Sequence, residues 1–72
     1  MESIDLHSFK HEDVPRFLER KINDLWDTDT EVEIITGHSE EMKRIVRQIL
    51  SDYKLECRED HPHNMGMFRT VI

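Results

Sequence analysis

Two short stretches of the chain alternate between apolar and polar residues, which is the pattern of a strand that buries one face. The first is IDLHSF, residues 4–9, and the second is EVEIIT, residues 31–36. We predict strands over residues 3–7 and 31–36. Since a strand needs only its buried face to be apolar, the outward positions Asp5 and His7 are free to serve another purpose.

Two longer segments carry apolar residues three or four positions apart, which predicts amphipathic helices. The first helix should begin near residues 13–15, because Pro15 is tolerated only in a first turn and Asp13 is a candidate cap. The second should follow Ser39, a residue type that caps helices well. The predicted buried stripes are Val14, Phe17, Leu18, Ile22 and Leu25 in the first helix, and Met42, Ile45, Val46, Ile49, Leu50 and Tyr53 in the second.

The last part of the chain predicts two more strands. KLECR, residues 54–58, alternates again, and MGMFRTVI, residues 65–72, is rich in β-prone residues, with a turn between them at residues 59–64. The element order is then βαβαββ. We predict one domain over residues 1–72, with the α/β architecture of a two-layer sandwich in which two helices cover one face of a four-stranded sheet.

This topology predicts where chemically active side chains gather. The first three strands would be mutually parallel, so their carboxyl ends would share one edge of the sheet, which is the usual place for a site in such folds. That edge would receive His7 from the first strand, Gly37 and His38 from the second, and the segment 61–66 from the final hairpin.

Net charge, cysteine content and the length of the apolar stretches limit the kinds of protein that this chain can be. The formal net charge is −6, which opposes the approach of a polyanion. The lone cysteine, Cys57, excludes an internal disulfide and suits a reducing compartment. No apolar stretch approaches the roughly 20 residues that a membrane span needs. We therefore expect a cytoplasmic protein without a membrane partner.

Asp5 and His7 are the candidate catalytic residues. A histidine oriented by a carboxylate can act as a general base, or it can stabilise charge on a phosphodiester oxygen. The alternative is an ordinary solvated strand face, because Asp and His often share the open side of a sheet.

Three basic residues of the second predicted helix, Lys43, Arg44 and Arg47, are expected on its exposed side, where they could contact a phosphate backbone. They are also spaced to pair with Glu40 and Glu41, which would make them a solvated helix face instead.

Metal binding rests on weaker evidence. His61 and His63 flank Pro62, and together with His7 and His38 they could present several imidazoles to one divalent cation. The H-x-H pattern alone is not specific, and no cysteine or carboxylate pair has a standard metal spacing. We therefore assign no metal ligand and leave a divalent cation cofactor open.

The combination of motifs resembles the Smr domain, the small MutS-related module, over nearly the whole chain. Its hallmarks are an L-D-L-H-G segment, matched here by Asp5, Leu6 and His7, and a T-G-x-G segment, matched by Thr36 and Gly37. Gly66 corresponds to the glycine at the entry to the last strand. The sequence departs from the motifs at Ser8 and Ser39, which replace glycines at positions where we expect a close backbone approach or a positive φ.

The resemblance implies a fold like the C-terminal domain of bacterial translation initiation factor three, with the terminal strand inserted antiparallel between the second and third to give the sheet order 1-2-4-3. It also implies binding of DNA or RNA and, in several members, endonuclease cleavage of phosphodiester bonds by the motif aspartate and histidine. The expected nucleic-acid-binding residues are Gly37, His38, Ser39, Lys43, Arg44, Arg47 and Gly66. The alternative is a module that kept the fold but not cleavage, and that holds a protein, a structured RNA or a second copy of itself.

Overall fold

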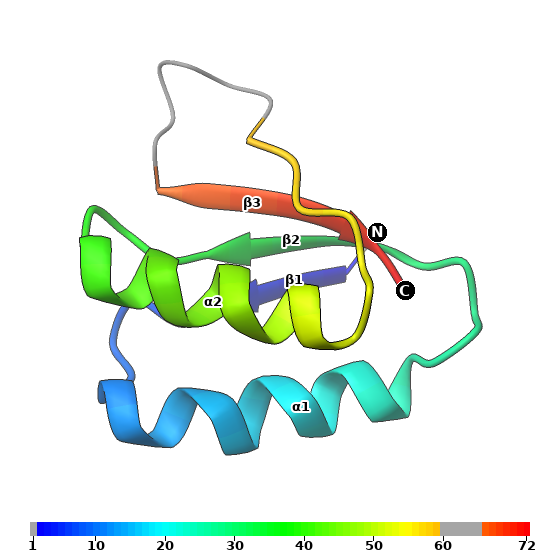
Figure 1. The fold of residues 1–72 in the computed structure, drawn as a ribbon, viewed down its shortest axis with the longest axis horizontal. Coiled ribbons are helices and arrows are strands. Elements are labelled where there is room, and N and C mark those ends of the chain that lie inside the picture. Colours follow the sequence, from blue (N-terminus) through cyan, green and yellow to red (C-terminus); the bar gives the residue numbers. More distant parts are fainter. Residues whose placement is uncertain (1, 60–65) are drawn as a thin grey trace.

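The computed structural model describes residues 2–59 and 66–72 and has an α+β fold with two helices and a three-stranded mixed sheet (Figure 1). The elements are the strand β1 (Glu2–Asp5), the 3₁₀ turn η1 (His11–Asp13), the helix α1 (Val14–Asp24), the strand β2 (Glu31–Ile35), the helix α2 (Glu40–Asp52) and the strand β3 (Met67–Val71).

The strand β2 lies at the centre of the sheet. It pairs in parallel with β1 and antiparallel with β3, so the order is β1-β2-β3. One row across the sheet contains Ile4, Ile34 and Phe68, which pair in register. All three side chains are buried, so the alternation that predicted the strands also sets which face meets the helices.

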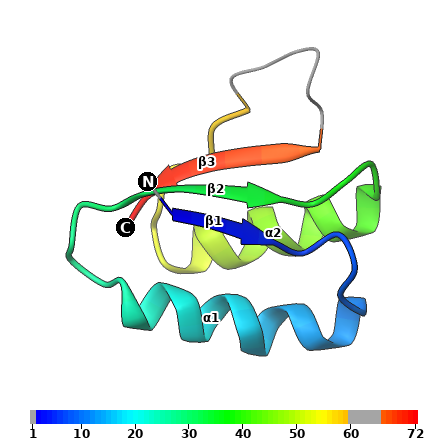
Figure 2. The ribbon, with the colours of Figure 1, turned by 180° about the vertical axis from the view of Figure 1, so that it is seen from behind.

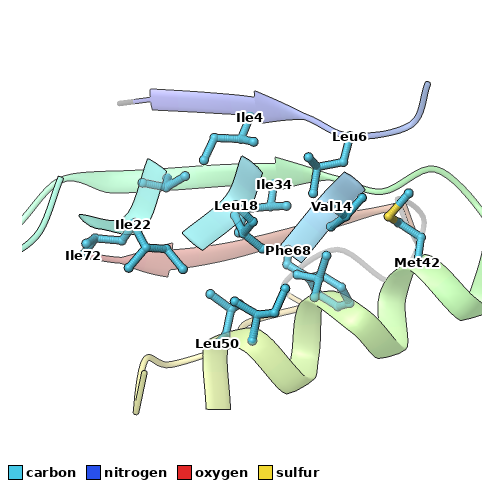
Figure 3. Close-up of a cluster of buried hydrophobic side chains, with 13 residues drawn as sticks. Ile4, Leu6, Val14, Leu18, Ile22, Ile34, Met42, Leu50, Phe68 and Ile72 are labelled. Atoms are coloured by element: carbon cyan, nitrogen blue, oxygen red, sulfur yellow. The ribbon is translucent and has the colours of Figure 1, made fainter. Parts of the chain in front are cut away.

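Both helices cover the same face of the sheet, as the views from the two sides show (Figures 1 and 2). The core lies between these two layers (Figure 3). Burying each aliphatic side chain contributes about 1.5–3 kcal/mol relative to exposure. The buried apolar residues are Ile4, Leu6, Val14, Leu18, Ile22, Val32, Ile34, Met42, Val46, Ile49, Leu50, Phe68 and Ile72.

The two helices begin differently. Ser39 caps α2 as predicted, because its hydroxyl accepts a hydrogen bond from the Met42 amide at 3.1 Å. Asp13 occupies the predicted cap position of α1, but its side chain makes no capping hydrogen bond. The turn η1 precedes α1 instead, and Pro15 falls in the first turn, where its missing N–H is not needed.

The predicted strand over residues 54–58 is reduced to a single antiparallel bridge between Arg58 and Arg69, whose amides and carbonyls bond at 2.9 Å. The start of this segment is used to end α2, because Lys54 has a φ of 58° and the Leu55 amide bonds back to the Leu50 carbonyl at 2.8 Å. The predicted turn falls mostly on residues 60–65, which lie outside the described residues.

Candidate functional site at the carboxyl ends of β1 and β2

His7, Gly37 and Gly66 come from three separate parts of the chain and meet where β1 and β2 end and β3 begins. A Cβ atom on Gly37 would lie 3.4 Å from the Cβ of His7, which is van der Waals contact. A Cβ atom on Gly66 would lie 2.9 Å from the Gly37 carbonyl oxygen. We call these three residues the rim. Their meeting matches the prediction that parallel strand ends share one edge.

Both glycines of the rim have a structural reason to be glycine. Gly37 has a φ of 70°, in the left-handed region that residues with a Cβ rarely adopt. Gly66 has no room for a side chain against Gly37. The Gly66 carbonyl accepts hydrogen bonds from the amides of Thr36 at 2.7 Å and Gly37 at 3.2 Å. Since the Gly37 amide is used inside the protein, Gly37 shapes the turn and does not offer that amide to a phosphate.

Asp5 and His7 form a hydrogen-bonded pair beside the rim. The Asp5 Oδ1 atom contacts His7 Nδ1 and also accepts the His7 backbone amide at 3.1 Å. Both hydrogen bonds lower the pKa of Asp5 below its ordinary value of 3.8, and the side-chain bond contributes more than the backbone bond. The carboxylate is therefore ionised at neutral pH and accepts only, so the proton of neutral His7 sits on Nδ1. The Nε2 lone pair is then available to take a proton.

The Asp5–His7 pair is open to solvent. The side chains of Asp5 and His7 are 52% and 59% exposed. The pair is therefore accessible to a ligand, but the fold does not exclude water from it. Electrostatic stabilisation is strongest where water is excluded. Any shielding would have to come from the ligand itself.

His11 belongs to this region although the sequence motifs do not include it. Its Nε2 atom lies 3.3 Å from Ser39 Oγ, which ties η1 to the start of α2. The only indication in the sequence is its place in the loop that follows the first strand, because that loop leaves the same edge of the sheet. His38 also lies at this edge, between Gly37 and Ser39, and is exposed.

The two serines that replace motif glycines fit the backbone without strain. Ser39 has a φ of −72°. Ser8 is not among the described non-glycine residues with positive φ, which are Asp27, Asp29 and Lys54. The positive φ expected at these two positions is therefore not found, while the close approach of the backbone to a ligand, the other expected reason for glycine, stays a prediction.

The basic residues of α2 do not form an open cationic surface. The prediction that Lys43 is exposed is wrong, because Lys43 is only 5% exposed. It precedes Val46 by one helical turn and Leu50 by two, so it lies on the buried stripe. Its stem is covered, while Nζ reaches Glu40 Oε1 at 3.6 Å.

Arg44 and Arg47 are exposed, but each is paired with a carboxylate. The hydrogen bond between Arg44 and Glu41 lowers the pKa of Glu41 and raises that of Arg44. Arg47 lies 3.2 Å from Glu59 and sits over the Phe68 ring at 5.4 Å from its centroid. The solvated helix face, the alternative interpretation, therefore describes these two arginines better than a phosphate-binding surface does.

Among residues 2–59 and 66–72, no three His, Cys, Asp or Glu side chains are grouped so that they could hold a metal ion. His61 and His63, on which the metal hypothesis depended, lie outside the described residues. Within the same ranges, neither helix has the length and apolar character to cross a membrane.

Comparisons with known proteins leave the interpretation to the residues themselves. A scan against protein-family models, a search of curated proteins and a search of solved structures each found no match to this chain.

Proposed function

We propose that this chain is an Smr-like domain that binds nucleic acid at the rim and hydrolyses a phosphodiester bond with Asp5 and His7. The observation that carries the proposal is that Gly37 lies beside both His7 and Gly66, since these positions match separate motifs of the family and are brought together by the fold. A shared edge beside a histidine–carboxylate pair is a suitable place for phosphate chemistry.

In this mechanism Asp5 is a positioning residue and His7 is the catalytic residue. Asp5 accepts a hydrogen bond from the Nδ1 proton of His7. Nε2 is therefore unprotonated and can act as a base. Nε2 removes a proton from a water molecule as that water attacks phosphorus. The bond to the leaving oxygen breaks on the opposite side, and that oxygen takes a proton from solvent, which the exposure of the site allows. The protonated imidazole then stabilises the negative charge of the phosphate oxygens.

In this proposal His38 and Ser39, which lie next to the rim, contact the phosphates. Both follow Gly37 at the entry to α2. The Ser39 oxygen accepts the Met42 amide and lies 3.3 Å from His11 Nε2, so a phosphate would replace His11 as the second partner of the Ser39 hydroxyl. Lys43, Arg44 and Arg47 are not assigned to the site, because burial or carboxylate partners already account for their charges.

The proposal extends to the finer fold. In the Smr-like arrangement, residues 54–58 form a further strand beside the terminal strand, which gives the order 1-2-4-3. The support for this is the antiparallel bridge between Arg58 and Arg69, which lies on the side of β3 away from β2. The half-buried Leu55 and Cys57 alternate there with the exposed Glu56, as a strand would require.

The test is a cleavage assay with labelled DNA and RNA oligonucleotides at low salt, run with Mg²⁺ and with chelator. We expect His7→Ala to reduce the cleavage rate by about 10²–10⁴-fold, the usual contribution of general acid–base catalysis. Asp5→Asn should also reduce it. Asp24→Asn, the same chemical change at the far end of α1, is the matched control and should cleave at the parental rate. Equal rates for the parent and His7→Ala would exclude the catalytic role.

A non-catalytic interaction module is the second candidate. The exposure of the Asp5–His7 pair and the neutralised arginines of α2 favour it, because neither provides a shielded or strongly cationic centre. It predicts binding without turnover. Affinity that survives the double change Asp5→Asn and His7→Ala, in a protein that never cleaves, would support this candidate over the enzyme.

A further inference from the structure

The ten Lys and Arg residues of the chain divide into two sets according to whether they make an ion pair with a carboxylate. One set makes ion pairs with carboxylates and consists of Lys43, Arg44, Arg47, Arg58 and Arg69. The other set has no ion pair among residues 2–59 and 66–72 and consists of Lys10, Arg16, Arg20, Lys21 and Lys54. Four members of the second set fall within residues 10–21.

This segment reverses the charge balance of the molecule. Residues 10–21 carry four Lys or Arg residues against the three acids Glu12, Asp13 and Glu19, which is a local charge of +1. The chain as a whole has −6, so the remainder carries −7. A polyanion that overcomes the general repulsion would therefore be attracted to this segment in preference to the rest of the surface.

Part of this segment, together with Phe9 from the preceding loop, forms a hollow of about 300 Å³. The hollow is lined by Phe9, Asp13, Arg16, Phe17 and Arg20. Arg16, Phe17 and Arg20 follow Asp13, the cap position of α1, by three, four and seven residues, so the four share one side of the helix, next to the stripe that enters the core. Phe9 arrives from the loop after β1, where its amide donates to the Leu6 carbonyl at 3.0 Å. We call this feature the α1 hollow.

Aromatic rings form one wall of the α1 hollow. The Phe9 and Phe17 ring centroids are 4.6 Å apart with an interplanar angle of 45°. Both rings are only partly buried and pack against the core, so they are held in place while keeping exposed surface. Lys21 Nζ lies 5.9 Å from the Phe17 centroid. Rigid rings beside unneutralised cations are what proteins use to bind nucleic acid whose bases are unstacked.

We propose that the α1 hollow binds single-stranded nucleic acid, with a base stacked on the Phe9–Phe17 pair and the adjoining phosphates on Arg16 and Arg20. The proposal rests on the function proposed above and specifies it, since it names the strand class and the surface that holds it. Duplex is excluded from this site because paired bases cannot leave the stack to reach the rings. Asp13 repels phosphate, so the backbone follows the arginine side.

The α1 hollow is joined to the rim by a short piece of chain. Phe9 follows His7 closely in sequence, and His11 of η1 contacts Ser39 at the start of α2. A strand held by Arg16 and Arg20 could thus run along η1 toward Asp5 and His7. This path supplies cations that the rim itself lacks.

The test measures fluorescence anisotropy of a short labelled oligothymidine, and of a duplex of equal length, at several salt concentrations. The double variant Arg16→Gln/Arg20→Gln should bind the single strand about tenfold more weakly or worse, and the slope of log K against log salt should fall by about 1.4, because each phosphate contact on a single strand accounts for about 0.7. Arg44→Gln/Arg47→Gln removes the same charge from α2 and should leave affinity near the parental value.

Phe9→Leu tests the stacking step separately. Loss of one base–aromatic contact weakens binding by about 1–3 kcal/mol, which is roughly five- to 150-fold. Leucine keeps an apolar contact with the core, and a thermal unfolding curve close to the parent's establishes that the fold is intact. A folded Phe9→Leu protein with parental affinity would overturn the stacking assignment.

The outcomes separate this inference from the proposed function. If the parent binds and both arginine pairs matter equally, or neither matters, the α1 hollow is not the site, while nucleic-acid binding stands. If the parent binds duplex as tightly as single strand, the strand class is wrong. If the parent binds neither at low salt, both proposals fail.

Discussion

The two helices bury similar apolar stripes against one sheet face but treat charge in opposite ways. Helix α2 begins with a serine cap and two first-turn glutamates, and its arginines find carboxylates. Helix α1 begins without a side-chain cap, and its arginines, Arg16 and Arg20, have no ion pair within the described parts of the chain. Local ion pairs and caps stabilise a helix. The charges of α2 are therefore satisfied within the described part of the protein and those of the two α1 arginines are not, and the proposed binding at the α1 hollow rests on this difference.

The largest predicted effect is a loss of folding stability when a buried leucine of either helix is shortened. Leu18 on α1 and Leu50 on α2 are both fully buried. We expect Leu18→Ala and Leu50→Ala each to lower the free energy of unfolding by roughly 2–5 kcal/mol, through lost burial and the cavity left behind. Urea denaturation of the two variants measures this, with the half-buried Leu25→Ala as the milder control. A large loss at only one helix would show that the two do not contribute equally to the core.

A smaller effect should separate the helix starts. Ser39→Ala removes the hydroxyl that accepts the Met42 amide, so we expect a loss of about 1 kcal/mol in the free energy of unfolding. Asp13→Ala removes no capping bond and should change stability much less. Ser39→Asp, which restores an acceptor, should recover most of the loss. Equal effects at Ser39 and Asp13 would contradict the assigned difference between the two starts.

The smallest predicted effect is a change in the pKa of Glu41 when Arg44 is replaced. Arg44 holds the pKa of Glu41 below its ordinary value of 4.5 in the folded protein. A depressed carboxyl pKa adds stability that is fully present above the unfolded value and disappears as pH falls through the folded value. NMR titration should find Glu41 below 4.5, and Arg44→Gln should move it upward. An unchanged Glu41 titration in Arg44→Gln would mean that the pair does not form in solution.

Periodicity predicted the parts of the fold that depend on burying apolar residues. The alternating positions of β1 and β2 and both helical stripes enter the core as expected. For Lys43 the two signals conflict, because its charge predicts exposure while its spacing places it on the buried stripe of α2, and the spacing proves decisive. The strand predicted over residues 54–58 is present only as the bridge between Arg58 and Arg69, because alternation predicts which side chains are covered and not whether a neighbouring backbone is paired along its length.

The candidate site was predictable where it depends on topology alone. Parallel strands predicted that His7 and Gly37 would adjoin, and they do. His11 and the α1 hollow depend instead on the path of the loop after β1, which no periodic pattern specifies. The spacing of Phe17 predicts a place in the core stripe, and spacing does not indicate that one side of its ring stays exposed.

The acidic ends of β1 have a consequence for self-association. This strand pairs only with β2 in the described sheet, so its other side presents unpaired backbone groups to solvent. If two molecules joined antiparallel and in register along this side, Glu2 of each would face Asp5 of the other. Like charges directly opposite disfavour such pairing. The negative charge that hinders a polyanion thus also protects the protein from aggregating strand to strand.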